Sequence, residues 1–175
     1  MKFTSESRIA HSRIKSFQAY RDRLEELVPF LEDIEKIEVV SRKEEGGVVA
    51  LHNLWVADQE VPVFAKAFVK KEMLCWDDFA TWDEEAFRCN WEIKTRAFSE
   101  AVTCRGSNTF YEDGESQTRV VLEGEFLIDL KKVRGVPKFL GKSLGPKLEK
   151  FIVGLISPNL QKVNQSIEDF LNQAG

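Results

Sequence analysis

The sequence predicts an α+β fold in which a curled antiparallel sheet is covered on one face by a long C-terminal helix. Between residues 34 and 130, short segments with the two-residue alternation of strands are separated by turn-forming residues. Residues 144–173 instead carry apolar side chains three and four positions apart, as in a helix with one wide apolar face. Strands joined by tight turns pair antiparallel and need a cover on one face, so the helix is expected to lie across the sheet.

The predicted C-terminal helix is long and bent. Gly145 and Pro146 mark its expected start, because proline in the first turn gives up an amide that has no partner there. Pro158 falls in the middle, where it removes one backbone hydrogen bond and predicts a kink. About 28 residues at about 1.5 Å each give a rod of roughly 40 Å. A rod of this length requires a broad apolar partner.

The N-terminal part predicts one strand followed by two short helices. Residues 2–9 read as a rather polar strand, and Ser12 can cap the helix that follows. Apolar residues from Ile14 to Leu31 have helical spacing, which is interrupted near Pro29. The two short helices are therefore expected to form a V after the first strand.

The sheet is completed by strands in the middle of the chain. Residues 59–70 interrupt their rhythm and predict a short helix with Pro62 at its first position, although a strand also fits. Together with the first strand, the sheet is expected to contain about six or seven strands in a single domain spanning residues 1–175. The remaining strands are predicted over residues 34–43, 48–56, 73–82, 87–95, 101–111 and 117–130.

Composition narrows the classes of protein. The net charge of −4 argues against nucleic acid as the main partner. No apolar run approaches the length of a membrane span, and the N-terminus lacks a signal segment, so a cytoplasmic protein is expected. Three cysteines without CxxC spacing suit a reducing compartment. With only two histidines in addition, the sequence predicts neither a metal site nor a cofactor.

A cavity is expected between the helix and the sheet. A straight rod on a twisted sheet makes contact at its ends more readily than in its middle, so space is left between them. Many side chains expected to point inward are aromatic or small. The predicted lining comprises Asn53, Trp55, Phe64, Phe68, Phe87, Cys89, Trp91, Cys104, Asn108, Phe110, Leu122, Phe126, Phe151 and Leu155.

The order of elements and the N-terminal motif resemble a known superfamily. The stretch Tyr20-Arg21-Asp22 to Ile37-Glu38-Val39, followed by an acidic glycine turn, is similar to the start of many bacterial proteins of the START-related superfamily. These proteins have the helix-grip fold of the birch pollen allergen and of polyketide cyclases. The resemblance covers nearly the whole chain and implies binding of a hydrophobic or amphipathic small molecule, such as a lipid, an isoprenoid or a polyketide.

Two other functions fit the same fold. An aromatase/cyclase-type enzyme would fold a polyketide-like substrate in the cavity and would need a buried acid or base with a shifted pKa. A filled cavity would instead indicate an interaction module without catalysis. Because the superfamily shares a cavity and no invariant chemistry, a binding protein is favoured over an enzyme.

Few residues are candidates for chemistry. His52 and Glu92 are weak catalytic candidates, since no partner is evident for either. His52, Asn53, Asn90 and Asn108 are candidates for orienting a ligand. Asp77, Asp78, Asp83, Glu84 and Glu85 could pair for acid/base work or hold a divalent cation. However, the last three form a turn and the first two must point to opposite faces of one strand, so a structural role is favoured. Cys89 and Cys104 are expected to be small core or cavity residues rather than nucleophiles.

A basic segment interrupts this acidic protein. Seven positive charges between residues 131 and 150 face one acid, Glu149. Either this segment is a solvated loop, or it docks on an anionic membrane surface or an acidic ligand head group. The residues predicted to contact a membrane are Lys131, Lys132, Arg134, Lys138 and Lys142.

Residues 59–69 and the exposed edge of the sheet each allow two interpretations. Residues 59–69, with Phe64 and Phe68, form either a lid over the cavity or a helix packed permanently on the core. The exposed edge of an open sheet is compatible with a monomer or a homodimer.

Overall fold

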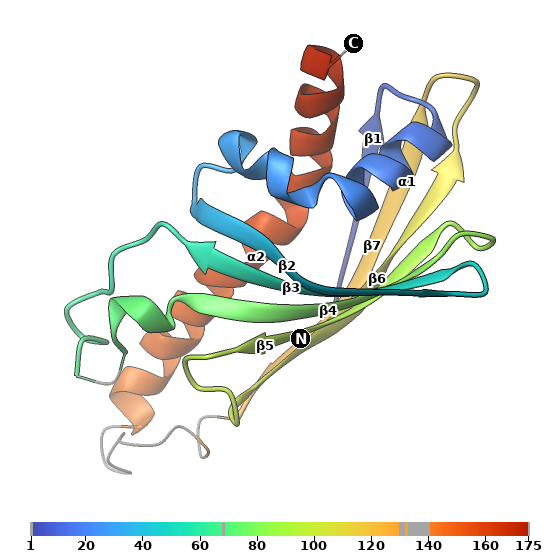
Figure 1. Ribbon diagram of the computed structural model, residues 1–175. Coiled ribbons are helices and arrows are strands. Elements are labelled where there is room, and N and C mark those ends of the chain that lie inside the picture. The colour runs from blue at the N-terminus through green and yellow to red at the C-terminus, as the bar shows by residue number, and fades with distance from the viewer. Residues whose placement is uncertain (1, 68, 130–131, 133–140, 175) are drawn as a thin grey trace.

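The computed structural model describes residues 2–67, 69–129, 132 and 141–174 (Figure 1). It contains one seven-stranded antiparallel sheet with the strand order β1-β7-β6-β5-β4-β3-β2. The strands are β1 (Lys2–Ile9), β2 (Ile34–Glu45), β3 (Val48–Ala57), β4 (Cys75–Asp83), β5 (Arg88–Thr95), β6 (Val102–Glu112) and β7 (Thr118–Ile128). The helices are α1 (Arg13–Asp22), η1 (Leu24–Phe30), η2 (Lys71–Met73) and α2 (Gly141–Ala174), of which η1 and η2 are 3₁₀ helices. The predicted α+β class is confirmed.

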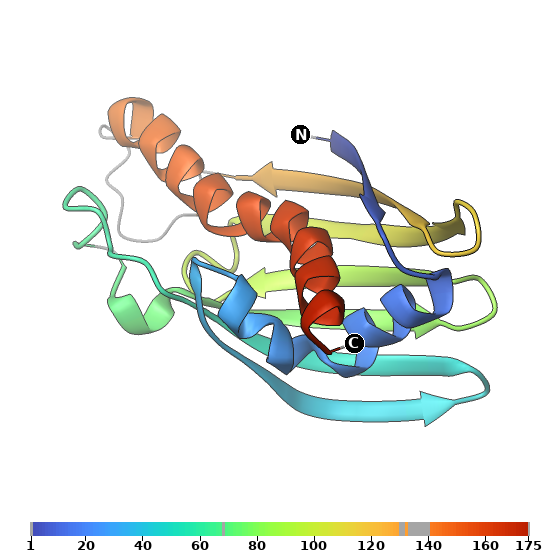
Figure 2. The same ribbon diagram turned by 90° about the horizontal axis from the view of Figure 1, so that it is seen from above.

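Helices cover one face of the sheet. Figure 2 shows α2 crossing this face diagonally, with α1 and η1 on the same side. Within the described residues, α2 packs chiefly against η1, β1 and α1, and not along the middle strands. Among the described residues, the closest backbone approaches of α2 are thus to the edge strand β1 and to the two helices that share its side of the sheet.

Alternation of side chains sets the inner face of each strand. In β5, Cys89, Trp91 and Ile93 are buried, whereas the intervening side chains are exposed. Two glycines on the inner face let rings approach the sheet closely: the ring of Trp91 occupies the space of a side chain at Gly106, and the ring of Phe3 that of a side chain at Gly124. Gly106 and Gly124 pair directly across β6 and β7, so the sheet is thinnest at this point.

The long helix is bent and begins earlier than predicted. It starts at Gly141 rather than near Leu144, and Pro146 lies inside it. Pro146 is tolerated because it leaves unpaired only the carbonyl of Lys142, in the first turn. Figure 2 shows the bend in the middle of α2, and Pro158, which cannot donate to the carbonyl of Gly154, lies in this central part.

Two connections differ from their predicted form. The break between the two N-terminal helices lies at Arg23, and Pro29 lies inside η1, where its fixed φ angle suits a 3₁₀ turn. The predicted helix over residues 59–70 is instead a series of turns in its described part. Isolated hydrogen bonds from Lys66 N to Pro62 O and from Val69 N to Ala65 O hold these turns at 3.1 and 2.9 Å.

Within the described residues, no helix combines the length and apolar character that a membrane span requires.

Candidate functional site

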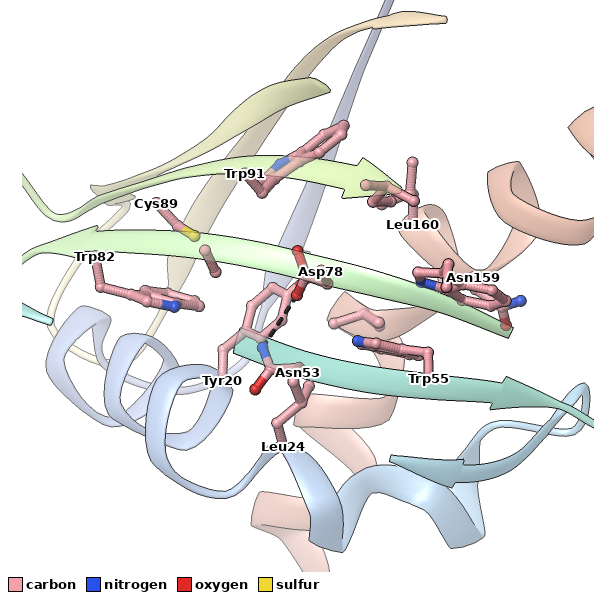
Figure 3. Close-up of a pocket in the computed structure, with 14 residues that line it drawn as sticks. Tyr20, Leu24, Asn53, Trp55, Asp78, Trp82, Cys89, Trp91, Asn159 and Leu160 are labelled. Carbon is pink, nitrogen blue, oxygen red and sulfur yellow. Dashed lines mark hydrogen bonds between the residues drawn. The ribbon is translucent and has the colours of Figure 1, made fainter. Parts of the chain in front are cut away.

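A pocket lies between the inner face of β3, β4 and β5 and the helices α1, η1 and α2 (Figure 3). All four tryptophans of the chain line it. The lining residues are Tyr20, Leu24, Asn53, Trp55, Trp76, Asp78, Ala80, Trp82, Cys89, Trp91, Ile93, Asn159, Leu160 and Val163. The site is thus mainly aromatic and aliphatic, with few polar groups, as is typical of small-molecule pockets.

The pocket is narrow. The free space among its side chains is about 500 Å³, including the part that opens to solvent, but only about 30 Å³ can take the centre of a water molecule. One water requires about 10–15 Å³ by the same measure, so the pocket as it stands has room for a few waters or a compact chemical group. A larger ligand requires its walls to separate.

Asp78 is the only charged residue among those that line the pocket. It pairs with Asn53 in the register of β3 and β4, and the Asn53 amide donates a hydrogen bond of 3.1 Å to its carboxylate. Burial raises the pKa of Asp78 to about 6, because the apolar surroundings disfavour the ionised form more than the hydrogen bond favours it. This side chain therefore changes charge near neutral pH.

A hydrogen bond joins the pocket wall to β6. The indole nitrogen of Trp91 donates to the Asn108 side-chain carbonyl oxygen at 3.2 Å. Burial raises the pKa of Tyr20, with further contributions from Cys89 and Asp78, so its hydroxyl keeps its proton. Asn108 thus fixes the orientation of the Trp91 indole in the pocket wall.

Three buried polar atoms of the pocket have no hydrogen-bond partner among the described residues. They are Asn53 Oδ1, Trp55 Nε1 and Trp82 Nε1, on side chains that are 1%, 6% and 2% exposed. Trp55 Nε1 is near enough to Asp78 to favour the ionised carboxylate, but its geometry falls short of a hydrogen bond. Unpaired buried polar groups are rare in proteins, so this set offers hydrogen bonds to a bound molecule or to water.

The structure places the predicted cavity residues in several locations. Asn53, Trp55, Cys89 and Trp91 line the pocket. Phe64 and Phe151 contact each other edge to face, with ring centroids 6.5 Å apart, away from the pocket lining. Phe68 and the side chain of Leu155 lie outside the described residues. Buried on the inner face of β6 and β7, beyond the pocket lining, are Cys104, Asn108, Phe110, Leu122 and Phe126.

Phe87 lies in the turn before β5 rather than in the pocket. Its φ angle is 48°, which is uncommon for an aromatic residue. Its ring packs against Phe17 at 5.3 Å and under the guanidinium of Arg13 at 3.8 Å. These contacts fix the turn at the α1 end of the sheet.

The two catalytic candidates lie on the opposite, outer face of the sheet. His52 Nε2 is 2.7 Å from Asp77 Oδ1, and its ring stacks on Phe79 at 4.5 Å. Glu92 forms a long ion pair of 3.9 Å with Lys94. Neither side chain lines the pocket.

Other predicted polar and acidic residues also lie away from the pocket. Asn90 accepts a hydrogen bond of 3.1 Å from Arg88 on the outer face. Asp83 caps the turn before β5 by accepting from the backbone amides of Glu85 and Ala86 at 3.0 and 2.9 Å. Glu84 pairs with Arg21 of α1.

The pocket contains functional candidates that sequence reasoning assigned elsewhere or did not single out. The sequence placed Asp77 and Asp78 on opposite faces of one strand and favoured a structural role for both. Asp78 alternates in step with Trp76, Ala80 and Trp82, and this pattern could have placed it inside. Tyr20 was noted as part of an apolar helix face and of the motif that carries the family resemblance, but not as a pocket residue. Asn159 had no distinguishing signal beyond its position next to Pro158.

The described residues show no reactive thiol and no metal site, and they include little of the basic segment. Burial raises the pKa of Cys104 to about 12 and that of Cys89 well above its ordinary value, so both remain thiols. Among the side chains that the structure describes, no group of three His, Cys, Asp or Glu is placed to hold a metal ion. Of the predicted membrane contacts, only the side chain of Lys132 is described; it is exposed and lies 3.9 Å from Asp129.

Comparison with known proteins decides the fold. The structure matches TTHA0849 from Thermus thermophilus with a TM-score of 0.66 and 21% identity, over 100% of this chain and 99% of that one. It matches the Zhui aromatase/cyclase from a Streptomyces species with a TM-score of 0.64 and 14% identity, over 100% and 98% of the two chains. A START superfamily protein from Mycobacterium smegmatis gives a TM-score of 0.57 and 11% identity, over 99% of each chain.

This is the START-like helix-grip fold. The resemblance seen in the sequence is thereby confirmed at the level of structure. No protein-family model matches the chain, and no curated protein matches it by sequence. At these identities the shared feature is the fold, so function has to be argued from the pocket itself.

Proposed function

We propose that this protein binds a small apolar or amphipathic molecule in the pocket between the sheet and α2. The observation that carries the proposal is the composition of the lining, in which all four tryptophans of the chain surround one half-buried carboxylate. Burial of apolar ligand surface at about 25 cal/mol per Å² would supply the affinity. The unpaired polar atoms would set the orientation of the ligand.

Binding requires the pocket to widen, because its present free space suits only a compact group. The wall formed by α2 consists of Asn159, Leu160 and Val163. Because α2 packs chiefly against η1, β1 and α1, this wall can move away from the central strands while its contacts at the rim persist. The ligand would therefore enter between α2 and β4.

The tryptophans provide a direct test. Titration with the neutral fluorophore N-phenyl-1-naphthylamine should give saturable energy transfer from tryptophan at one probe per chain. The variant Ala80→Leu, which adds volume to the pocket wall, should weaken binding at least tenfold. The matched control is Ala50→Leu on the exposed face of the neighbouring strand, which should bind as the wild type does. Absence of saturable binding, or equal loss in both variants, would refute the proposal.

A second candidate is catalysis of the cyclase or dehydrase type, in which Asp78 moves protons. It is favoured by the position of this carboxyl in an apolar pocket and by its pKa of about 6, which suits a general acid or base near neutral pH. A general test is the ring opening of 5-nitrobenzisoxazole, in which a base removes the C3 proton while the N–O bond breaks. The rate should rise with pH through about 6 and be lost in Asp78→Asn. An equal rate in this variant would exclude Asp78 as the base.

The remaining predictions concern the cellular location and the oligomeric state of the protein. We propose a cytoplasmic location, which is supported by three buried cysteines that form no disulfide with one another. A monomer or a homodimer joined at the exposed edge strand β2 is also proposed. Analytical ultracentrifugation distinguishes the two states.

A further inference from the structure

We propose that the molecule bound in this pocket carries a protonated amine, which binds between the Asp78 carboxylate and the surrounding aromatic rings. This inference rests on the proposed binding function and adds the chemical class of the ligand. The charge of the lining, the arrangement of the rings and the unpaired acceptor of Asn53 each support it independently.

The first argument is charge balance. Elsewhere in the fold, partly buried carboxylates have cationic partners: Asp22 pairs with Arg21 and Arg42, each at 2.8 Å, and Asp77 lies 3.6 Å from Arg96. Asp78 has only the neutral amide of Asn53 as its described hydrogen-bond partner, and no Lys, Arg or His is among the described residues that line the pocket. An ionised carboxylate in such surroundings is unfavourable unless it is paired. A cationic ligand would supply the missing partner, whereas an anionic one would add repulsion.

The second argument is the arrangement of the rings. Figure 3 shows Asp78 near the centre of the pocket, with Trp82 on one side and Trp55 on the other. The indoles of Trp55 and Trp76 are stacked at 5.8 Å with an interplanar angle of 16°, and Tyr20 meets Trp82 edge to face at 5.1 Å. Aromatic faces around a buried carboxylate are the usual environment for an organic ammonium group, which is attracted both to the charge and to the rings.

The third argument concerns hydrogen bonding and size. Asn53 Oδ1 is buried and without a described partner, on the side chain whose amide nitrogen already binds Asp78. Asp78 and Asn53 Oδ1 thus supply two acceptors, from directly paired residues, and this suits an ammonium group with at least two N–H donors. Such a group also fits the small space that is open in the pocket, about 30 Å³, while an attached apolar tail would occupy the space gained when α2 moves. A primary amine with an apolar tail is therefore the expected ligand class.

The test compares three probes of equal length at about pH 8: n-octylamine, which is protonated, 1-octanol, which is neutral, and octanoate, which is anionic. Binding is followed by tryptophan fluorescence and by calorimetry. We expect octylammonium to bind at least tenfold more tightly than 1-octanol, and octanoate to bind most weakly. In Asp78→Asn, the affinity for octylammonium should fall to that for 1-octanol, while 1-octanol binding should be unchanged.

Asp77→Asn is the matched control, because it removes a carboxylate from the adjacent position on the outer face. It should leave the affinities for all three probes as in the wild type. If 1-octanol binds as tightly as octylammonium, or if Asp78→Asn does not lower the affinity for octylammonium, the amine is excluded and binding of an apolar molecule stands. If no probe binds, both the amine and the proposed function fail.

Discussion

The Asn53 amide donates a hydrogen bond of 3.1 Å to the Asp78 carboxylate, and both side chains project from directly paired positions of β3 and β4 into one pocket. The bond holds the carboxylate in place without neutralising it. The protein therefore maintains a half-buried acid in an aromatic pocket, which is unfavourable for folding and supports the proposed role in binding.

Replacement of Asp78 by Asn should stabilise the protein at high pH. The folded-state pKa of about 6 lies above the unfolded value of 3.8, so the folded state holds the proton more tightly. As pH rises from about 4 to about 6, ionisation of Asp78 should therefore cost stability, and this cost is fully present above pH 6. The difference between these two pKa values corresponds to at most about 3 kcal/mol of stability. Denaturant unfolding should show Asp78→Asn to be more stable than wild type at pH 8, with a smaller difference at pH 4.

The other titratable groups near Asp78 determine which controls this experiment needs. Burial and the nearby Asp78 carboxylate raise the pKa values of Tyr20 on α1, Cys89 on β5 and Cys104 on β6, so all three remain neutral in this range. His52 acts from the outer face and favours the ionised form. Comparing the double variant His52→Asn/Asp78→Asn with the single variant His52→Asn gives the effect of Asp78 without the charge of His52. A stability difference that grows toward low pH would contradict the prediction.

Addition of one methyl group at Gly106 should destabilise the sheet. A Cβ there would lie 2.2 Å from the backbone oxygen of Glu123 and 2.5 Å from the ring of Trp91. Because the backbone cannot give way easily, Gly106→Ala should lower the free energy of unfolding by about 1–3 kcal/mol. Gly154→Ala is the control: no atom lies within 4 Å of a Cβ at this exposed helical position, so stability should rise by up to about 1 kcal/mol. Equal effects would contradict this account.

The native cysteines should react slowly with alkylating reagents. Cys75, Cys89 and Cys104 are all buried, and burial raises the pKa of each thiol. Since the thiolate is the reactive form, labelling by iodoacetamide at about pH 8 should be far slower in the native protein than in urea. Mass spectrometry identifies the labelled positions. Rapid labelling of Cys89 in the free protein would show that the pocket is already open in solution.

The basic segment between residues 131 and 150 should direct the protein to anionic membranes. Each Lys or Arg near an anionic bilayer contributes about 1 kcal/mol, and the effect is screened by salt. Sedimentation with phosphatidylserine-containing vesicles should therefore retain more protein than sedimentation with phosphatidylcholine alone, and high salt should release it. The variant with Lys131, Lys132 and Arg134 changed to Gln should lose this binding. Binding that ignores lipid charge and salt would exclude an electrostatic contact.

The sequence by itself determined the kinds of elements and their order. Two-residue alternation in segments such as residues 88–95 requires strands, because successive side chains point to opposite faces. The three- and four-residue spacing after Leu144 requires a helix with one apolar face, and Pro158 requires a bend in it. These are local rules of backbone geometry, so they hold without knowledge of any distant contact.

Only the tertiary structure decided which side chains meet. Asp77 and Asp78 are adjacent and chemically identical, yet register and curl place one with His52 on the outer face and the other among tryptophans. The pKa of Asp78, the unpaired oxygen of Asn53 and the narrowness of the pocket depend on distances between residues far apart in the sequence. Desolvation is a property of the whole surroundings of a group, so the sequence names the acid and the fold determines its environment.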